Sequence, residues 1–185
     1  MKRLYNTPEQ KQEIKEALDT GSMILILRAF FFPKLARTFL IRLTLVIVTA
    51  WVFFRFICIP LVIRGGSMLP TYPEHGFVFC WCPAYWFSSP KRGDIVVMKY
   101  GKGVMILKRV VALEGDRVSF TNGVLILNGK PVTEPYIKGP SSWNLPERTV
   151  QRGHLYLVGD NRSIPIETHI FGEMHKRYLA GTPLW

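Results

Sequence analysis

The sequence has few cysteines, and the three present, Cys58, Cys80 and Cys82, do not form repeated short-spaced pairs. They therefore support neither a disulfide framework nor a structural zinc site. Acidic residues are also scarce, because 13 Asp and Glu stand against 24 Lys and Arg and leave a formal net charge of +11. This charge directs attention to nucleic acid, an anionic membrane surface or an acidic partner. The length of 185 residues suits about one domain, and the 48% hydrophobic content argues against a disordered basic tail.

Long apolar runs are rare in the chain, and residues 43–63 form the outstanding one. This run holds a single charge, Arg55, and as a helix it would extend roughly 31 Å, enough to cross the apolar core of a bilayer. It predicts a transmembrane helix that ends near Pro60. Its uncharged part covers only residues 43–54, so a buried core helix and the apolar region of a signal peptide are the alternatives. No small-residue A-x-A pattern follows that would favour removal of the segment.

The residues before this run are basic, which predicts a cytoplasmic position for the N-terminal segment. Its positive residues are Lys2, Arg3, Lys11, Lys15, Arg28, Lys34, Arg37 and Arg42. We therefore divide the chain into a cytoplasmic or interfacial segment (1–42), a transmembrane helix (43–63) and an extracytoplasmic domain (64–185). Residues 23–32 are apolar but too short to span and stop at Pro33, so we expect them at the membrane interface or packed beside the main helix, with a second span as the alternative.

Beyond residue 63 the pattern changes to short runs typical of β-strands, separated by Gly, Pro and Asn. The predicted strands are residues 77–82, 94–100, 104–113, 117–120, 124–127 and 154–158. Asn-Gly pairs at 122–123 and 128–129 flank one of these strands and predict the tight turns of a small meander. Residues 136–147 contain Gly, Pro and Ser without periodicity, so we expect an exposed loop there before the last strand. The sequence thus predicts a mainly β domain behind one N-terminal transmembrane helix.

A lysine is the best candidate for a catalytic base, because the four histidines belong to no recognisable triad and no G-x-S-x-G motif is present. Lys108 and Arg109 lie inside an apolar strand, where one of the two must face the core. Burial lowers the pKa of a lysine, whereas an arginine keeps its proton in almost any site. Lys108 could thus serve as the base for Ser67, which lies in a glycine-rich connection after the apolar run. The alternative is that both charges face solvent at a sheet edge and that Ser67 is only a turn residue.

Four blocks occur in order along the chain: Ser-Met-Leu-Pro-Thr at 67–71, Arg-Gly-Asp-Ile-Val-Val at 92–97, Leu-Lys-Arg-Val-Val-Ala-Leu-Glu-Gly-Asp at 107–116 and Gly-Asp-Asn-Arg at 159–162. The set resembles the membrane-anchored type I signal peptidases, a serine–lysine protease family, from about Arg55 to Gly181. The resemblance implies a small signal-peptidase-like β domain in which Ser67 attacks the scissile carbonyl and Lys108 acts as general base and then as general acid. It implies no metal and no organic cofactor.

The resemblance also implies roles for residues around the dyad. Oxyanion and substrate binding are assigned to Gly65, Ser67 and Met68, although the family often has a hydroxyl at the position of Gly65. The residues expected to support the active site are Asp160, Asn161, Arg162, Ser163 and Thr168.

The sequence departs from the family pattern after the last block. Where the family has Ser, Asp, Ser and Arg, this chain has Pro165, Glu167, Thr168 and His169. Pro165 cannot supply the hydroxyl that holds the lysine amine in the family, so Ser163 or Thr168 is expected to replace it. Glu167 and His169 could replace the family's structural ion pair only in part and with pH dependence. These departures predict a divergent subfamily, with an inactive relative as the alternative.

The resemblance implies a serine-type endopeptidase of the bacterial cell membrane that removes N-terminal signal peptides from exported preproteins. Its expected partners are signal peptides and the lipid bilayer, with the secretion translocon as a further candidate and no nucleic acid. An aromatic cluster predicts contact with the membrane interface, with core packing as an equal alternative; its members are Trp81, Tyr85, Trp86 and Phe87. The alternative functions are a peptidase for a restricted substrate such as a pilin, a non-catalytic membrane-anchored binding module, and a soluble serine–lysine autoprotease joined to a repressor. The last requires a helix-turn-helix where this chain has an apolar run.

Overall fold

The computed structural model describes residues 8–19, 37–101, 103–137 and 139–184. The chain forms two compact units, Met1–Ala50 and Trp51–Trp185, and the described strands all belong to the second. The first unit contains helix α1 (Pro8–Asp19) and most of helix α3 (Arg37–Val52). The apolar segment at residues 23–32 lies outside the described residues.

Helix α3 continues into a short π-helix, η1 (Phe53–Ile57), and the two provide the apolar span. The span covers Phe39–Ile57, has a mean hydropathy of 2.0 and is 0% buried. It ends at Ile57 rather than at the predicted residue 63, because the chain changes there to strand β1 (Cys58–Val62). Pro60 disfavours helical backbone at the residue before it and fits an edge strand, and β1 is the edge strand of its sheet.

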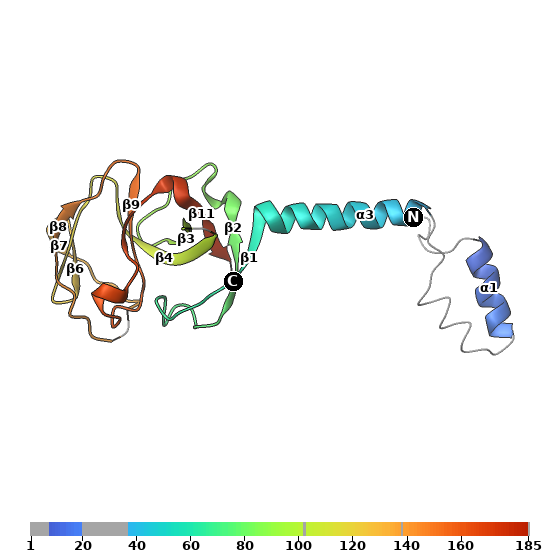
Figure 1. Ribbon diagram of the computed structural model, residues 1–185, viewed down its shortest axis with the longest axis horizontal. Coiled ribbons are helices and arrows are strands. Elements are labelled where there is room, and N and C mark those ends of the chain that lie inside the picture. Colours follow the sequence, from blue (N-terminus) through green and yellow to red (C-terminus); the bar gives the residue numbers. More distant parts are fainter. Residues whose placement is uncertain (1–7, 20–36, 102, 138, 185) are drawn as a thin grey trace. The chain divides into compact units, whose positions relative to one another are not determined.

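The second unit is mainly β, as predicted, and its described strands form two antiparallel sheets. The larger sheet has the order β1-β2-β11-β3-β4-β9-β10, and besides β1 it contains β2 (Phe77–Trp81), β3 (Ile95–Tyr100), β4 (Val104–Leu113), β9 (His154–Val158), β10 (Gly172–His175) and β11 (Leu179–Leu184). The smaller sheet has the order β7-β6-β5-β8 and consists of β5 (Arg117–Thr121), β6 (Val124–Leu127), β7 (Lys130–Pro131) and β8 (Leu145–Thr149). Figure 1 shows the smaller sheet at the end of the β unit that lies opposite β1 and β2.

The six predicted strands are present as β2, β3, β4, β5, β6 and β9, with ends that differ by at most one residue. The expected loop at residues 136–147 is wrong in its second half, because Trp143 is buried in the core and β8 begins at Leu145. Two further strands, β10 and β11, follow β9, which the pattern places last. The sequence of β11 contains Gly181 and Pro183 and lacks apolar alternation, which hides it from pattern reading.

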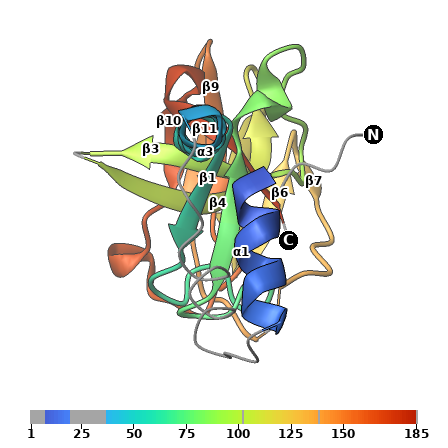
Figure 2. The ribbon, with the colours of Figure 1, turned by 90° about the vertical axis from the view of Figure 1, so that its right-hand side faces the viewer.

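Strand β4 lies in the interior of the larger sheet, between β3 and β9. Its residue Val110 packs in one buried cluster with Val96 and Leu157, whereas Val111 packs in another with Phe120 of the smaller sheet. Both faces of β4 are therefore covered near its middle. The two clusters shield the side chains in the middle of β4 from water. Figure 2 shows β3 and β4 extending side by side as a hairpin.

Candidate active site

Ser67 lies in a compact turn between β1 and β2 and is half-buried. Backbone hydrogen bonds from the Leu69 N–H to the Gly66 carbonyl (3.1 Å) and from the Tyr72 N–H to the Met68 carbonyl (2.9 Å) shape the turn. Met68 and Tyr72 are 1% and 2% exposed and anchor the turn in the core. Met68, which is expected among the substrate-binding residues, is thus placed as a packing residue.

The segment after β9 holds the Ser67 turn in place. The backbone N–H of Asn161 donates to the Ser67 carbonyl at 3.0 Å, and its side-chain amide donates to the Gly66 carbonyl at 3.0 Å. Gly159 approaches so closely that a Cβ there would lie 2.3 Å from the Ser67 carbonyl oxygen, which only glycine avoids. The first and last sequence blocks therefore form one structural unit around the serine.

Lys108 lies on β4, opposite Val96 of β3, and is 3% exposed. Its neighbour Leu107 packs against the core cluster that contains Met68, so the strand contacts the serine turn. Burial lowers the pKa of the Lys108 amine to about 8, although the negative charge of Asp160 acts in the opposite direction. The amine is therefore half neutral near pH 8, where an ordinary lysine is almost fully charged.

Neither the Ser67 hydroxyl nor the Lys108 amine forms a hydrogen bond or an ion pair within the described residues. The packing of Leu107 against the cluster that contains Met68 brings the neighbours of the two residues into contact, and no hydrogen bond joins Ser67 to Lys108. The part of the chain that the structure describes also contains no group of three or more His, Cys, Asp and Glu that could hold a metal ion. The chemistry available from Ser67 and Lys108 is nucleophilic attack with proton transfer to an amine.

Gly65 has a left-handed backbone with a φ of +87°, and a Cβ built there would meet no atom within 4 Å. Space for a side chain exists, but this φ strains any residue with a Cβ. A hydroxyl donor therefore could not be supplied from this position without a backbone change. Without a hydroxyl at position 65, an oxyanion would be bound by backbone N–H groups. The N–H of Ser67 is the expected donor.

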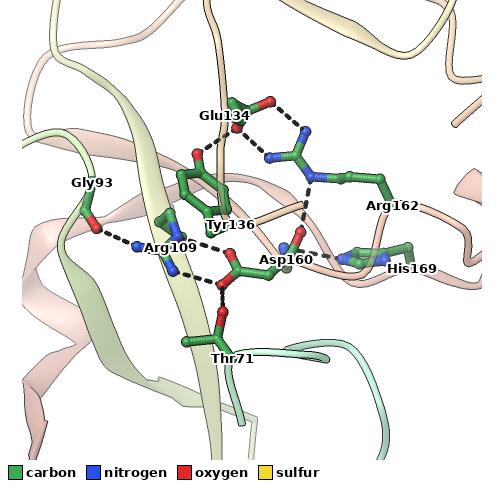
Figure 3. A network of polar contacts seen from close by, with 9 residues as sticks. Thr71, Gly93, Arg109, Glu134, Tyr136, Asp160, Arg162 and His169 are labelled. Carbon is green, nitrogen blue, oxygen red and sulfur yellow. Dashed lines mark hydrogen bonds and ion pairs between the residues drawn. The ribbon is translucent and has the colours of Figure 1, made fainter. Parts of the chain in front are cut away.

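Arg109 is also buried, at 9% exposed, and unlike the lysine beside it has partners on every side (Figure 3). Its Nε and Nη2 donate to the two carboxylate oxygens of Asp160 at 2.8 and 2.6 Å, and its Nη1 donates to the Gly93 carbonyl at 2.7 Å. The Thr71 hydroxyl donates to the same carboxylate at 2.5 Å. The ring of Tyr136 lies 3.8 Å from the guanidinium carbon, measured to the ring centroid. Asp160 and Arg109 thus connect all four sequence blocks.

Arg162 forms a second buried ion pair beside the first (Figure 3). Its Nη1 and Nη2 donate to the carboxylate of Glu134 at 3.0 and 2.6 Å, and its Nε donates to the Gly159 carbonyl at 2.9 Å. The Tyr136 hydroxyl donates to Glu134 at 2.5 Å, and burial together with this carboxylate raises the pKa of the tyrosine. Sequence reasoning missed Glu134 and Tyr136, whose only local signal is a Glu-Pro-Tyr turn pattern.

The residues after the last block do not supply the support expected for the lysine. The Ser163 hydroxyl donates to the side-chain oxygen of Asn161 at 2.5 Å, and the Thr168 hydroxyl donates to the Pro165 carbonyl at 3.1 Å. Both residues are exposed and satisfied by their own loop. In the described part of the chain neither hydroxyl bonds to Lys108, so the replacement of the family's serine by Ser163 or Thr168 stays a prediction that these contacts do not support.

His169 and Glu167 do not form the expected partial ion pair. Glu167 is exposed, whereas His169 is 6% exposed and its Nε2 accepts a hydrogen bond from the Gly159 N–H at 3.1 Å. The imidazole ring contacts Trp143 edge to face, with centroids 4.9 Å apart, and Phe171 at 6.2 Å. The prediction is wrong because the imidazole faces backbone and aromatic rings inside the fold.

A model of the family described as "Signal peptidase, peptidase S26" matches residues 35–184. The chain belongs to this family. The matched range contains the four blocks that converge on Asp160, as well as the apolar span. As a member of the S26 signal peptidases the chain belongs to a family of serine peptidases, and its described residues include one apolar helix suited to anchor it in a membrane.

Sequence relatives in bacteria agree with this assignment. The chain is 32% identical over 139 residues to a probable signal peptidase I-1 of Synechocystis, an alignment that covers 70% of this chain and 71% of the relative. It is 30% identical to a signal peptidase I of Bacillus caldolyticus, over 65% of this chain and 74% of the relative. A crystal structure of a signal peptidase I from Enterococcus faecalis matches with a TM-score of 0.43 and 22% identity, over 51% of this chain and 97% of that one.

Proposed function

We propose that the chain is a membrane-bound serine endopeptidase that removes N-terminal signal peptides from exported preproteins, with Ser67 as nucleophile and Lys108 as general base. The observation that carries the proposal is the amine of Lys108, which is buried, has no hydrogen-bond partner among the described residues and lies on a strand that packs against the serine turn. Burial brings its pKa to about 8, so a useful fraction of the amine is neutral near physiological pH. Membership of the signal peptidase family supports the substrate class.

In the proposed reaction, Oγ of Ser67 forms a bond to the scissile carbonyl carbon while Nζ of Lys108 takes the hydroxyl proton. Backbone N–H groups stabilise the oxyanion of the tetrahedral intermediate. The carbon–nitrogen bond then breaks as the protonated lysine gives its proton to the leaving amine, which becomes the N-terminus of the mature protein. Water activated by the same lysine hydrolyses the acyl-enzyme and releases the signal peptide.

The proposed location follows from apolar surface outside the core. The span Phe39–Ile57 is long and apolar enough to cross a bilayer. The rings of Phe54 and Phe77 both lie beside that of Phe79, at centroid distances of 6.2 and 4.9 Å, and the side chain of Phe87 is 98% exposed. We propose a single-pass anchor in the bacterial cell membrane with a cytoplasmic N-terminus, an extracytoplasmic catalytic unit, and these aromatic side chains at the membrane surface.

The test is cleavage of a preprotein with an A-x-A signal peptide by the detergent-solubilised full chain. Ser67→Ala and Lys108→Ala are each expected to reduce the cleavage rate by about 10³-fold or more. The matched controls Ser142→Ala and Lys130→Ala change exposed residues and should retain the wild-type rate.

Other outcomes separate the competing functions. Cleavage that survives in both dyad variants would sink the proposed mechanism. A wild type that cleaves a pilin-like precursor and no general preprotein would assign the same chemistry to a restricted substrate. A wild type that binds preproteins without cleaving any would identify a binding module. The proposed topology is tested separately, by proteolysis of the extracytoplasmic unit in spheroplasts.

A further inference from the structure

His169 is a buried side chain that the proposed mechanism leaves without a role. It lies against the rings of Trp143 and Phe171, and its Nε2 accepts the N–H of Gly159 at 3.1 Å. A nitrogen that accepts an N–H carries no proton, so the ring is a neutral imidazole with its proton on Nδ1. Nδ1 is buried and has no hydrogen-bond partner among the described residues. The hydrogen bond from the Gly159 N–H is therefore the polar contact that orients the ring among the described residues.

The Gly159 peptide is enclosed between the imidazole and the serine turn. A Cβ on Gly159 would lie 2.7 Å from Nε2 of His169 and 2.3 Å from the carbonyl oxygen of Ser67. Two residues further on, Asn161 donates to the carbonyls of Ser67 and Gly66, both at 3.0 Å. A displacement of the imidazole would thus be transmitted through one glycine to the backbone of the nucleophile.

The charges around His169 favour its neutral form. Burial, followed by the positive charges of Lys108 on β4 and Arg162 after β9, lowers the pKa of His169 to about 3. The acidic groups of this region, Glu134 and Asp160, are each already paired with an arginine. A protonated ring would point a second N–H at the Gly159 N–H and would place a further cation near the lysine. The ring therefore stays neutral over the range in which Lys108 titrates.

We propose that His169 is a positioning residue, whose neutral imidazole fixes the Gly159 amide and thereby the placement of the Ser67 turn relative to Lys108. The expected effect of His169 on catalysis rests on the proposed function, whereas its contact with Gly159 is independent of that function. The acceptor provides a fixed contact for the backbone that carries the nucleophile.

The kinetic test compares two substitutions in the full chain. His169→Gln keeps an acceptor oxygen at a similar reach, whereas His169→Phe fills the space without an acceptor. Because small displacements of a reacting group are costly, we expect the Phe variant to lose about tenfold or more in kcat with KM changed less than about twofold, and the Gln variant to recover most of the loss. A Phe variant with wild-type kcat per folded molecule, whatever its stability, overturns the proposal, because a merely structural role would lower only the folded fraction.

A second measurement needs no cleavage and separates this inference from the proposed function. In ¹⁵N NMR spectra of the solubilised chain, His169 is expected to show an unprotonated Nε2 that does not titrate between about pH 5 and 9. The Gly159 amide is expected to exchange slowly with solvent in the wild type and in His169→Gln. This measurement tests the inference even if His169→Phe does not fold. A protonated Nε2, a titration near the ordinary histidine pKa, or a fast-exchanging Gly159 amide in the wild type overturns the inference even when cleavage is normal. A wild type that cleaves nothing but shows these signals overturns the proposed function alone.

Discussion

Lys108 and Arg109 are neighbours on β4 and both are buried, yet their surroundings are opposite. Arg109 binds both oxygens of Asp160 and the Gly93 carbonyl and lies against the ring of Tyr136. Lys108 has no bonded partner within the described residues, and burial lowers its pKa. A buried cation with partners keeps its charge and organises structure, whereas a buried cation without them tends to lose its proton. Arg109 thus stabilises the scaffold, whereas Lys108 is left as the proposed base.

The largest expected effect comes from removing the acid on the arginine side. Asp160→Asn leaves Arg109 buried without a counter-charge, and we expect the free energy of unfolding to fall by about 3–5 kcal/mol. Urea denaturation of the solubilised chain measures this. The matched control is Glu147→Gln, which removes the partner of Arg117 from an exposed pair at 3.4 Å and should cost less than about 1 kcal/mol. Equal losses of unfolding free energy in the two variants would show that the buried Arg109–Asp160 pair contributes no more to stability than the exposed pair.

On the lysine side, the pH dependence of catalysis is the sharpest prediction. If the neutral Lys108 amine is the base, as proposed, kcat/KM should rise about tenfold per pH unit below the pKa and level off above it. With a pKa of about 8, the rate at pH 6 should lie roughly 100-fold below the plateau. Initial cleavage rates across this range give the midpoint, and a midpoint above about 10 would show an ordinary, solvated lysine.

Stability should respond to the same amine with a defined sign. Since the folded-state pKa of Lys108 is lowered, the unfolded chain binds more protons between about pH 8 and 10.5, and wild-type stability should rise with pH in that window. Below it, both states are charged and the folded state carries the cost of a buried cation. Lys108→Met should therefore raise the free energy of unfolding at pH 7 by about 1–3 kcal/mol while abolishing cleavage.

The gain should shrink as the pH rises from about 8 towards 10.5, the ordinary pKa of lysine, because the folded wild type then no longer holds a buried cation. Lys130→Met, at an exposed position, is the control and should leave stability unchanged at either pH. A Met variant less stable than wild type at pH 7 would mean that the Lys108 amine is stabilised by interactions that offset its burial.

Much of this arrangement could be predicted from the sequence, because local patterns determine it. Strands such as β4 and β9 are apolar runs bounded by turn residues, and the ordered blocks indicated the serine and the lysine. The pattern also required one of Lys108 and Arg109 to face the core. It could not show that both are buried, because covering of the second face depends on the smaller sheet, which is distant along the chain.

The parts that could not be predicted depend on long-range pairing. Glu134 and Tyr136 lie in a segment without periodicity, and their roles appear only when Arg162 and Arg109 are brought beside them. The sequence predicts a partial ion pair for His169 because Glu167 and His169 stand where the resembling family has an aspartate and an arginine. Its actual partner is a backbone N–H, and backbone partners leave no trace in residue identity.

The smallest expected effect concerns the ring of Tyr136, which distinguishes two contributions on the arginine side. Tyr136→Phe removes the hydroxyl bond to Glu134 and keeps the ring over Arg109, and we expect a loss of about 1.5–3 kcal/mol. Tyr136→Leu removes the ring as well, and the further loss should be about 0.5–2 kcal/mol if the cation–π contact contributes as partly buried ones do. Denaturation of both variants gives this difference directly. Because neither variant changes Asp160, the charge that acts on the pKa of Lys108, neither should move the pH midpoint of cleavage. A shift in the Leu variant alone would show that the ring over Arg109 affects the lysine.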